Sequence, residues 1–167
     1  MQGDGDGWAA GPNGTRLWGH YGAAGLFLQA STAHGPAVLL QLRAHWTADG
    51  GTWGIPGGAR DSHETPSEAA LRETVEEAGI DPTRVRIHQE VITSGPFPAD
   101  PQRPELSGGW TYTTVLASTD AELATTANDE SIELRWVPID QLESLELIPP
   151  LRAALPALLE AWSKVAM

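Results

Sequence analysis

The sequence contains no cysteine, few basic residues and no long apolar run. Without cysteine, disulfide bonds, zinc–thiolate sites and cysteine nucleophiles are excluded. Ten Lys and Arg residues stand against 22 Asp and Glu residues, so the formal net charge is −12. Such a charge argues against non-specific binding to nucleic acid or to anionic lipid. It still allows a phosphate-bearing small molecule, because a bound metal ion can reverse the local sign.

Targeting and membrane signals are also missing. No apolar run approaches the ~20 residues of a membrane span, and the N-terminus lacks the basic-then-apolar pattern of a signal peptide. We therefore expect a cytoplasmic protein with no membrane partner.

The length of 167 residues predicts a single domain. Residues 1–14 are rich in Gly and Asp and are expected to form a flexible tail, followed by one domain over residues 15–167. Apolar and β-branched runs predict strands over residues 22–30, 37–46, 85–93, 110–117 and 131–138. Helices are predicted over residues 65–79 and 149–166, and a long proline-bearing loop over residues 94–109. This order indicates an α/β fold with a mixed sheet and helices on its faces.

The helix over residues 65–79 has clear signals at both ends. Thr65 suits the N-cap, Pro66 suits the first helical position, and Glu68 completes a capping box. Gly79 suits the C-cap. The boundaries of this helix are therefore predicted from the sequence.

Three carboxylates gather on one face of this helix. At about 100° per residue, Glu73, Glu76 and Glu77 fall on one side, with an apolar face opposite. Like charges repel at this spacing, and the macrodipole disfavours anions in the last helical turn. A bound divalent cation would relieve both problems, and carboxylate oxygens suit Mg²⁺. Helix geometry alone leaves a solvated acidic face as the alternative.

The spacing of charged residues and glycines extends beyond the helix. It reads Gly, five residues, Glu, seven residues, Arg-Glu, two residues, Glu-Glu, one residue, Gly and an aliphatic residue, over residues 58–80. This pattern resembles the Nudix box, the signature of the Nudix hydrolase family, and the resemblance covers about residues 52–80. Thr74 departs from it at a usually aliphatic position, which affects packing rather than metal binding. The resemblance implies an α/β/α sandwich with a mixed β-sheet.

The resemblance also implies roles for the glutamates. Glu73 and Glu77 would be the principal metal ligands. Glu76 would be a further ligand or the group that orients or deprotonates the attacking water. Gly57 would offer its backbone carbonyl to the metal. The implied cofactor is Mg²⁺ or Mn²⁺.

Other box residues would support the loop and helix. The resemblance implies an ion pair between Glu64 and Arg72, with Gly58 and Gly79 as further structural support. Alternatively, Arg72 pairs along the helix with Glu68 or Glu76.

A further carboxylate in this family often comes from a later loop, shortly before a strand that bears a tryptophan. Glu130 precedes Trp136 by six residues and Glu133 precedes it by three. This spacing favours Glu130 as a metal ligand with a catalytic role beside Glu73 and Glu76, and Glu133 is the second choice.

Two arginines and three aromatic residues are candidates for the substrate side. Arg43 ends a predicted strand where some MutT-like members place a phosphate-contacting arginine, and Arg60 lies in the box loop. Either could equally be a surface residue. Trp18, Trp110 and Tyr112 could stack on a base or pack in the core.

We therefore expect a pyrophosphohydrolase that acts on a nucleoside triphosphate, including oxidised ones such as 8-oxo-dGTP, or on a related nucleoside diphosphate derivative. An ADP-ribose or dinucleotide pyrophosphatase is the alternative, because Pro96 lies 16 residues past Ile80, near a position used by such members. A non-catalytic nucleotide-binding module is the third reading. The expected partner is a nucleotide-type small molecule, and a homodimer is compatible because family members often dimerise.

Overall fold

The computed structural model describes residues 3–47 and 49–165. Nine strands carry the sheets: β1 Trp8–Ala10, β2 Arg16–Trp18, β3 Ala23–Thr32, β4 Gly35–Arg43, β5 Trp53–Gly54, β6 Gly57–Ala59, β7 Arg86–Phe97, β8 Trp110–Thr119 and β9 Ser131–Pro138. The two α-helices are α1 Pro66–Ala78 and α2 Pro149–Val165. Three short 3-10 helices complete the described part of the chain: η1 Pro12–Gly14, η2 Pro82–Arg84 and η3 Ile139–Ser144. Within these residues, neither α-helix is long and apolar enough to cross a membrane.

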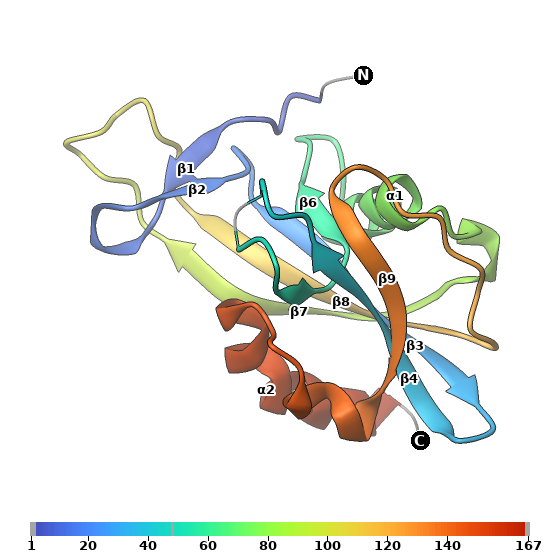
Figure 1. Ribbon diagram of the computed structural model, residues 1–167. Coiled ribbons are helices and arrows are strands. Elements are labelled where there is room, and N and C mark those ends of the chain that lie inside the picture. Colours follow the sequence, from blue (N-terminus) through green and yellow to red (C-terminus); the bar gives the residue numbers. More distant parts are fainter. Residues whose placement is uncertain (1–2, 48, 166–167) are drawn as a thin grey trace.

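A mixed sheet forms the middle layer. Its strands lie in the order β5-β4-β3-β8-β7, with β6 also paired to β3 and β9 to β4. Strands β3 and β8 run parallel, whereas β4 and β7 are antiparallel to their neighbours. Helices α1 and α2 cover opposite faces of this sheet (Figure 1). The expected α/β/α sandwich with a mixed sheet is confirmed.

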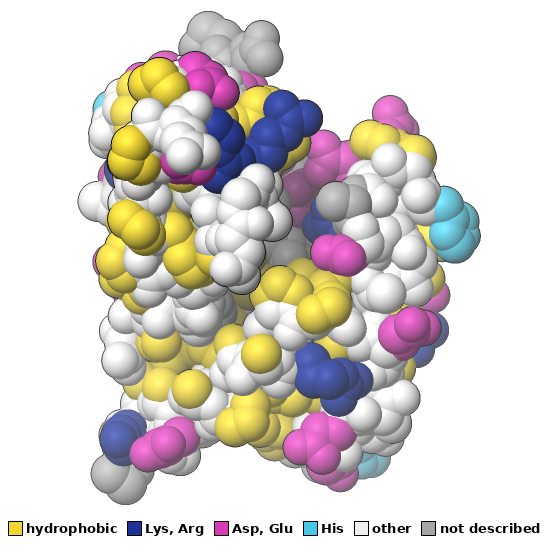
Figure 2. Space-filling view, turned by 90° about the vertical axis from the view of Figure 1, so that its left-hand side faces the viewer, with side chains coloured by type: hydrophobic (Ala, Val, Ile, Leu, Met, Phe, Trp, Pro, Cys, Tyr) yellow, Lys and Arg dark blue, Asp and Glu magenta, His cyan; other side chains and the backbone are white. Residues whose placement is uncertain are grey.

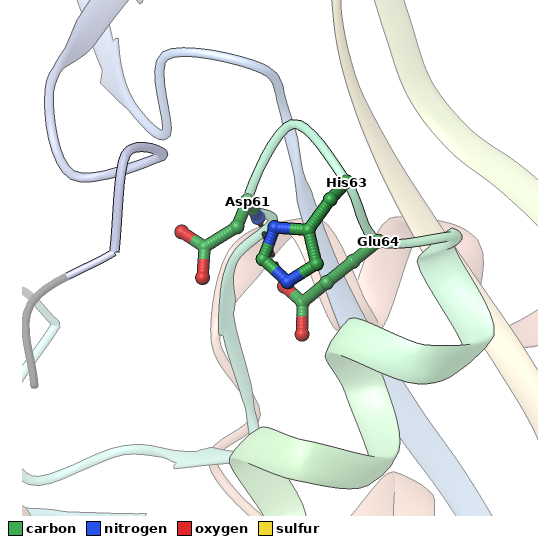
Figure 3. A group of neighbouring side chains, drawn as sticks. All are labelled: Asp61, His63 and Glu64. Carbon is green, nitrogen blue, oxygen red and sulfur yellow. Dashed lines mark hydrogen bonds between the residues drawn. The ribbon is translucent and has the colours of Figure 1, made fainter.

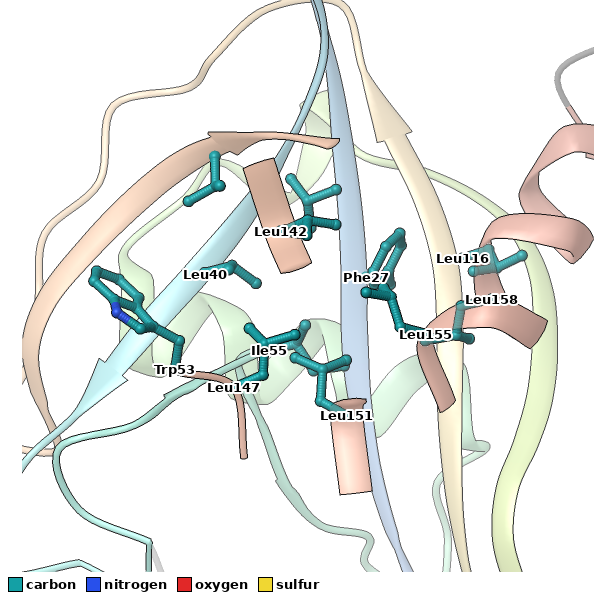
Figure 4. Packing of buried hydrophobic residues seen from close by; sticks show 12 residues of the cluster. Phe27, Leu40, Trp53, Ile55, Leu116, Leu142, Leu147, Leu151, Leu155 and Leu158 are labelled. Carbon is teal, nitrogen blue, oxygen red and sulfur yellow. The ribbon is translucent and has the colours of Figure 1, made fainter. Parts of the chain in front are cut away.

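Alternate residues of the central strands fill two separate cores. On β3, Leu26 and Leu28 pack toward α1, whereas Phe27 between them packs toward α2. On β4, Leu39 and Leu40 divide in the same way. All five side chains have no exposed surface, and Figure 4 shows the cluster on the α2 side. A strand covered on both faces needs a nearly continuous apolar run, which explains the pattern seen in the sequence.

Helix α1 has the ends that its sequence predicts. The hydroxyl of Thr65 accepts from the backbone N–H of Glu68, and the Glu68 carboxylate accepts from the N–H of Thr65. Gly79 ends the helix in the left-handed conformation, with φ 65°. Thr74, the departure from the family pattern, is fully buried and donates its hydroxyl to the carbonyl of Ala70 at 2.7 Å. Its polar atom is therefore satisfied inside the helix.

Residues 3–14 contain part of a hairpin where a flexible tail was expected, and residues 1 and 2 lie outside the described part of the chain. Strands β1 and β2 form an antiparallel hairpin, in which Trp8 meets Trp18 edge to face at 5.0 Å. Ala9 and Ala10 have no exposed surface, and the N–H of Ala10 donates to the carbonyl of Ser107 at 2.8 Å. The Gly-rich composition serves turns and close backbone approach here rather than disorder.

The expected loop over residues 94–109 is shorter than predicted. Strand β7 continues to Phe97, which pairs with Trp110 of β8, and the register shifts at three places along the way. These irregularities interrupt the alternation that sequence patterns detect. They also bring two aromatic rings side by side near the end of the sheet.

Candidate functional site

Two glutamates of α1 lie against strand β6, which contains Gly57 and Gly58. Strand β6 pairs with β3 and places Gly57 beside the last turn of α1, where its N–H donates to Oε2 of Glu77 at 3.2 Å. Gly58 faces the Glu73 carboxylate so closely that a Cβ would lie 2.6 Å from Cδ of Glu73. Gly58 therefore leaves room for the Glu73 carboxylate, whereas a Cβ on Gly57 would meet the backbone of Ala24 and Gly25 and the hydroxyl of Tyr112. Gly57 bonds Glu77 through its N–H. The expected role of its carbonyl as a metal ligand stays a prediction.

Burial disfavours the ionised forms of Glu73 and Glu77 and raises the pKa of both side chains. Glu77 is only 4% exposed, and burial raises its pKa to about 9, with the charges of Glu73 and Glu130 adding to the effect. Burial also raises the pKa of Glu73 to about 7, although Arg72 opposes this rise. A buried and a partly buried carboxyl with raised pKa values, one helical turn apart, are a donor set that a hard divalent cation would stabilise.

Glu76 lies on the same helix but faces solvent. Its side chain is 56% exposed, and its Oε1 lies 3.5 Å from Nη1 of Arg72. It is therefore accessible to water beside Glu73 and Glu77.

Arg72 connects the loop to the helix. Its Nε lies 2.7 Å from Oε2 of Glu64, its Nη2 lies 2.8 Å from Oε1 of the same residue, and Nη2 also donates to the carbonyl of Ala59 at 3.1 Å. Arg72 holds the pKa of Glu64 below its usual range. The structure thus brings Glu64 and Arg72 together, whereas Glu68 serves the capping box instead. The same guanidinium bonds Glu73 at 3.0 Å and fixes its position.

A second acidic group lies in the loop before α1. The side chains of Asp61, His63 and Glu64 have ligand atoms within 4.8 Å of one another (Figure 3). Arg72 already pairs with Glu64 and lies 3.9 Å from Asp61, and the N–H of Gly5 donates to Asp61 at 2.9 Å. Because a cation from the protein neutralises this group, we assign it to loop structure rather than to metal binding.

The loop before β9 delivers Glu130 to the cluster. The Glu130 carboxyl lies close enough to Glu73 and Glu77 that its charge contributes to the raised pKa of both, whereas Glu133 bonds Arg135 at 2.9 Å. Of the two candidates, the structure therefore brings Glu130 to the site. Asn128 fixes this approach: its Oδ1 accepts from the N–H of Glu130 at 3.0 Å, and its Nδ2 donates to the carbonyl of Glu76 at 3.4 Å. Sequence reasoning missed Asn128, because no local pattern marks a contact across 52 residues.

The two candidate arginines have different surroundings. Arg60 donates to the backbone carbonyls of Glu64 at 2.6 Å and Tyr21 at 3.1 Å. These contacts fix the loop and differ from the expected substrate contact, since they direct the guanidinium to backbone. Arg43 ends β4, and its positive charge opposes the rise in the pKa of Tyr112 that burial and Glu77 cause. Arg43 and Glu77 therefore both lie close enough to Tyr112 to affect the pKa of its hydroxyl.

A largely apolar cavity of about 400 Å³ is lined in part by Ile55, two residues before strand β6. Sheet residues, α2 and the N-terminal hairpin line it, including Phe97 and Trp110, whose rings stack at 6.1 Å. Tyr112 also lines it, and its hydroxyl would lie 2.0 Å from a Cβ on Gly25 and 3.0 Å from one on Gly57. Figure 2 looks onto the side of the molecule that carries the hairpin and shows a hollow with hydrophobic and charged side chains around it. Tyr112 therefore links the cavity to the carboxylate cluster.

Trp18, another stacking candidate, does not line the cavity. It is 47% exposed and packs against Trp8 on the hairpin. Its backbone carbonyl nevertheless accepts from the indole N–H of Trp110 at 3.1 Å.

Known proteins share both the fold and the box. A sequence model of the NUDIX domain matches residues 19–159. The chain is 48% identical over 155 residues, 92% of its own length and 69% of the relative's, to a Mycobacterium tuberculosis protein named "Putative 8-oxo-dGTP diphosphatase 3". It is 39% identical over 161 residues, 91% of its length, to a Bifidobacterium longum nucleoside triphosphate pyrophosphatase/Nudix hydrolase fusion protein, of which it spans 30%.

Solved structures agree with this result. The crystal structure of RenU, a Nudix hydrolase from M. smegmatis, matches with a TM-score of 0.87 and 44% identity, over 96% of this chain and 97% of that one. An Ap4A hydrolase of C. elegans, at 22% identity over 85% of this chain and 96% of that one, shares the fold with a TM-score of 0.61. The chain therefore belongs to the Nudix family, and its intact box and these relatives make it a Nudix hydrolase.

Replacing Gly58 by Ala is expected to lower turnover about 100-fold with little loss of stability. The new Cβ would lie 2.6 Å from Cδ of Glu73, so the flexible Glu73 carboxylate has to move while the backbone stays. A displacement of about 1 Å in a reacting geometry can reduce the rate on this scale. Steady-state kinetics and a thermal melt of the same preparation test this. A large fall in melting temperature together with unchanged kcat would contradict it.

Proposed function

We propose that this chain hydrolyses the pyrophosphate bond of purine nucleoside triphosphates in a reaction that depends on Mg²⁺ or Mn²⁺, with 8-oxo-dGTP as the leading substrate. The convergence of Glu73, buried Glu77 and Glu130 on one carboxylate cluster carries the proposal. The name of the M. tuberculosis relative, at 48% identity, supports the choice of substrate.

The carboxylates fit a divalent cation. The raised pKa values of Glu73 and Glu77 indicate that the charges present do not neutralise the cluster. In the proposal, Glu73, Glu77 and Glu130 hold the metal, and Glu76 is a further ligand or the group that takes the proton of the attacking water. A metal bound there supplies positive charge to the phosphate oxygens and lowers the pKa of a bound water.

The remaining residues of the box keep the ligands in place. Arg72 bonds both Glu64 and Glu73, so it fixes one ligand relative to the loop. The N–H of Gly57 fixes Glu77 from the opposite side. Exposed Glu76 can accept a proton from a water molecule and release it to solvent. These contacts provide positioning before any substrate binds.

The cavity suits the base of the substrate. Its volume of about 400 Å³ falls in the range of small-molecule sites. A planar purine can stack on aromatic rings such as those of Phe97 and Trp110, and hydroxyls of Thr93, Ser94 and Tyr112 also line the cavity. Arg43, at the end of β4, is the proposed contact for a phosphate group.

Product analysis tests this proposal. The purified chain would be incubated with Mg²⁺ or Mn²⁺ and with normal and oxidised nucleoside triphosphates, ADP-ribose, NADH or dinucleoside polyphosphates. We expect 8-oxo-dGMP and pyrophosphate from 8-oxo-dGTP, and no product with chelator. Preferred formation of AMP and ribose phosphate from ADP-ribose would support the alternative substrate. Absence of turnover across the whole panel would contradict the enzyme proposal for these substrates.

A further inference from the structure

The N-terminal arm, residues 3–18, contacts two separate parts of the site. It lies outside residues 19–159, which the family model matches. It is nevertheless ordered by the β1–β2 hairpin and by buried Ala9 and Ala10. An element outside the residues that the family model matches, and in contact with the site, can contribute to the choice of substrate.

One contact is with the apolar cavity. Pro12, Thr15 and Leu17 of the arm form part of its wall, together with Phe97 and Trp110 from the sheet. Leu17 is partly buried. A base that enters the cavity therefore contacts the arm on one side and the aromatic pair elsewhere.

The wall is held in place by hydrogen bonds from the rest of the chain. The indole N–H of Trp110 donates to the carbonyl of Trp18 at 3.1 Å. The guanidinium of Arg103 donates to the carbonyls of Gly14 at 2.9 Å and Thr15 at 3.1 Å. The turn of the hairpin is thus fixed relative to the cavity.

The other contact is with the loop before α1. Asp4 accepts from the backbone N–H of Ser62 at 2.9 Å and also from the Ser62 hydroxyl. Gly5 donates its N–H to Asp61 at 2.9 Å, and it approaches the loop so closely that a Cβ would lie 2.1 Å from the carbonyl oxygen of Arg60. This loop carries Glu64, which bonds Arg72 of helix α1 and so fixes the loop relative to that helix.

We propose that the N-terminal arm is a specificity element that sets the cavity wall relative to the carboxylate cluster and selects purine nucleotides. Leu17 contacts the base, and the Asp4–Ser62 contact holds the arm in the position that closes the cavity. This proposal rests on the proposed function, because it assumes that the cavity takes the base. It adds that residues outside the range matched by the family model decide which base is accepted.

Two arm variants and a matched control test the proposal. Leu17→Ala removes part of the wall and is expected to raise KM for 8-oxo-dGTP about tenfold, with kcat within twofold, since burial of an apolar side chain contributes to ligand contact. Asp4→Ala releases the contact to the loop and is expected to raise KM by a smaller factor. Both should reduce the preference for 8-oxo-dGTP over dTTP. Asp140→Ala, an exposed change in η3 outside the arm, should alter neither value.

Calorimetric titration with 8-oxo-dGMP in Mg²⁺ separates this proposal from the proposed function. The dissociation constant should rise in the Leu17→Ala protein as KM does. Unchanged KM, affinity and purine preference in both variants would overturn the proposal, even if their melting temperatures fall. If the parent protein binds 8-oxo-dGMP but hydrolyses no nucleotide, the proposed function fails while the affinities still decide the role of the arm. Absence of 8-oxo-dGMP binding to the parent protein would also overturn it.

Discussion

Replacing Glu77 by Gln is expected to lower turnover by about 10³-fold or more while making the metal-free protein more stable. Glutamine has nearly the same shape and keeps an acceptor for the N–H of Gly57, but it loses the charge that binds a cation. A metal ion contributes several kcal/mol of transition-state stabilisation, and each ~1.4 kcal/mol corresponds to a tenfold change in rate. Steady-state kinetics with 8-oxo-dGTP measures the loss.

The gain in stability follows from the burial of the same side chain. Glu77 is 4% exposed, and burial raises its pKa to about 9, so its ionised form is unfavourable in the folded protein without metal. At pH 8 in chelator, we expect the Glu77→Gln protein to melt about 5 °C above the parent, a shift typical of roughly 2 kcal/mol in a chain of this size.

Glu143 provides the matched control for both measurements. It is exposed in η3, outside the carboxylate cluster, so Glu143→Gln should change neither turnover nor melting temperature. Turnover retained by the Glu77→Gln protein, or a fall in its metal-free melting temperature, would contradict the role given to Glu77.

The stability of the metal-free protein is expected to fall as pH rises from about 5 to 9. The folded pKa values of Glu73 and Glu77 are raised to about 7 and about 9, from an ordinary value of 4.5. Between the unfolded and folded values, the folded state binds more protons, so their contribution is present at low pH and is lost as pH rises. Each pKa unit corresponds to about 1.4 kcal/mol, and the two groups together give an effect on the order of several kcal/mol.

Thermal melts with and without Mg²⁺ measure this dependence. Because the cation binds the ionised carboxylates, it should raise the melting temperature more at pH 8 than at pH 5.5. The Glu77→Gln protein should show a flatter pH profile in chelator. A parent protein whose metal-free stability rises between pH 5 and 9, or an equal effect of Mg²⁺ at both pH values, would contradict the pKa assignments.

Helix α1 could be predicted from the sequence because the residues that set its two ends act locally. The capping box of Thr65 and Glu68 and the left-handed Gly79 act within a few residues of the chain, and the structure has all three. The apolar runs of β3 and β4 also predicted strands at these positions. For Glu64 and Arg72, the resemblance to the Nudix box implied the contact that the structure contains.

Other parts depend on contacts between distant residues. The composition of residues 1–14 suggested a tail, but β1 pairs with β2, and the N–H of Ala10 donates to the carbonyl of Ser107. The sequence spacing could only rank Glu130 above Glu133; Asn128 and the end of α1 bring Glu130 to Glu77. The cavity likewise combines residues from the hairpin, two strands and α2, which no single motif contains.

An acidic protein can thus act on an anionic substrate, provided that a cation occupies its carboxylate cluster. The net charge of −12 disfavours long-range attraction of nucleotides. The raised pKa values of Glu73 and Glu77 indicate how strongly the cluster favours added positive charge. Metal binding is therefore the step on which the whole account depends.

Titration of Mn²⁺ into the parent and Glu77→Gln proteins tests that step most directly. Free Mn²⁺ followed by electron paramagnetic resonance gives the affinity, and a pH indicator in weak buffer gives the protons released. At pH 7.5 we expect Mn²⁺ to bind the parent with release of on the order of one proton, because burial keeps Glu77 protonated. The Glu77→Gln protein should bind far more weakly and release less. Equal Mn²⁺ affinity in both proteins, or no binding to the parent, would contradict the account.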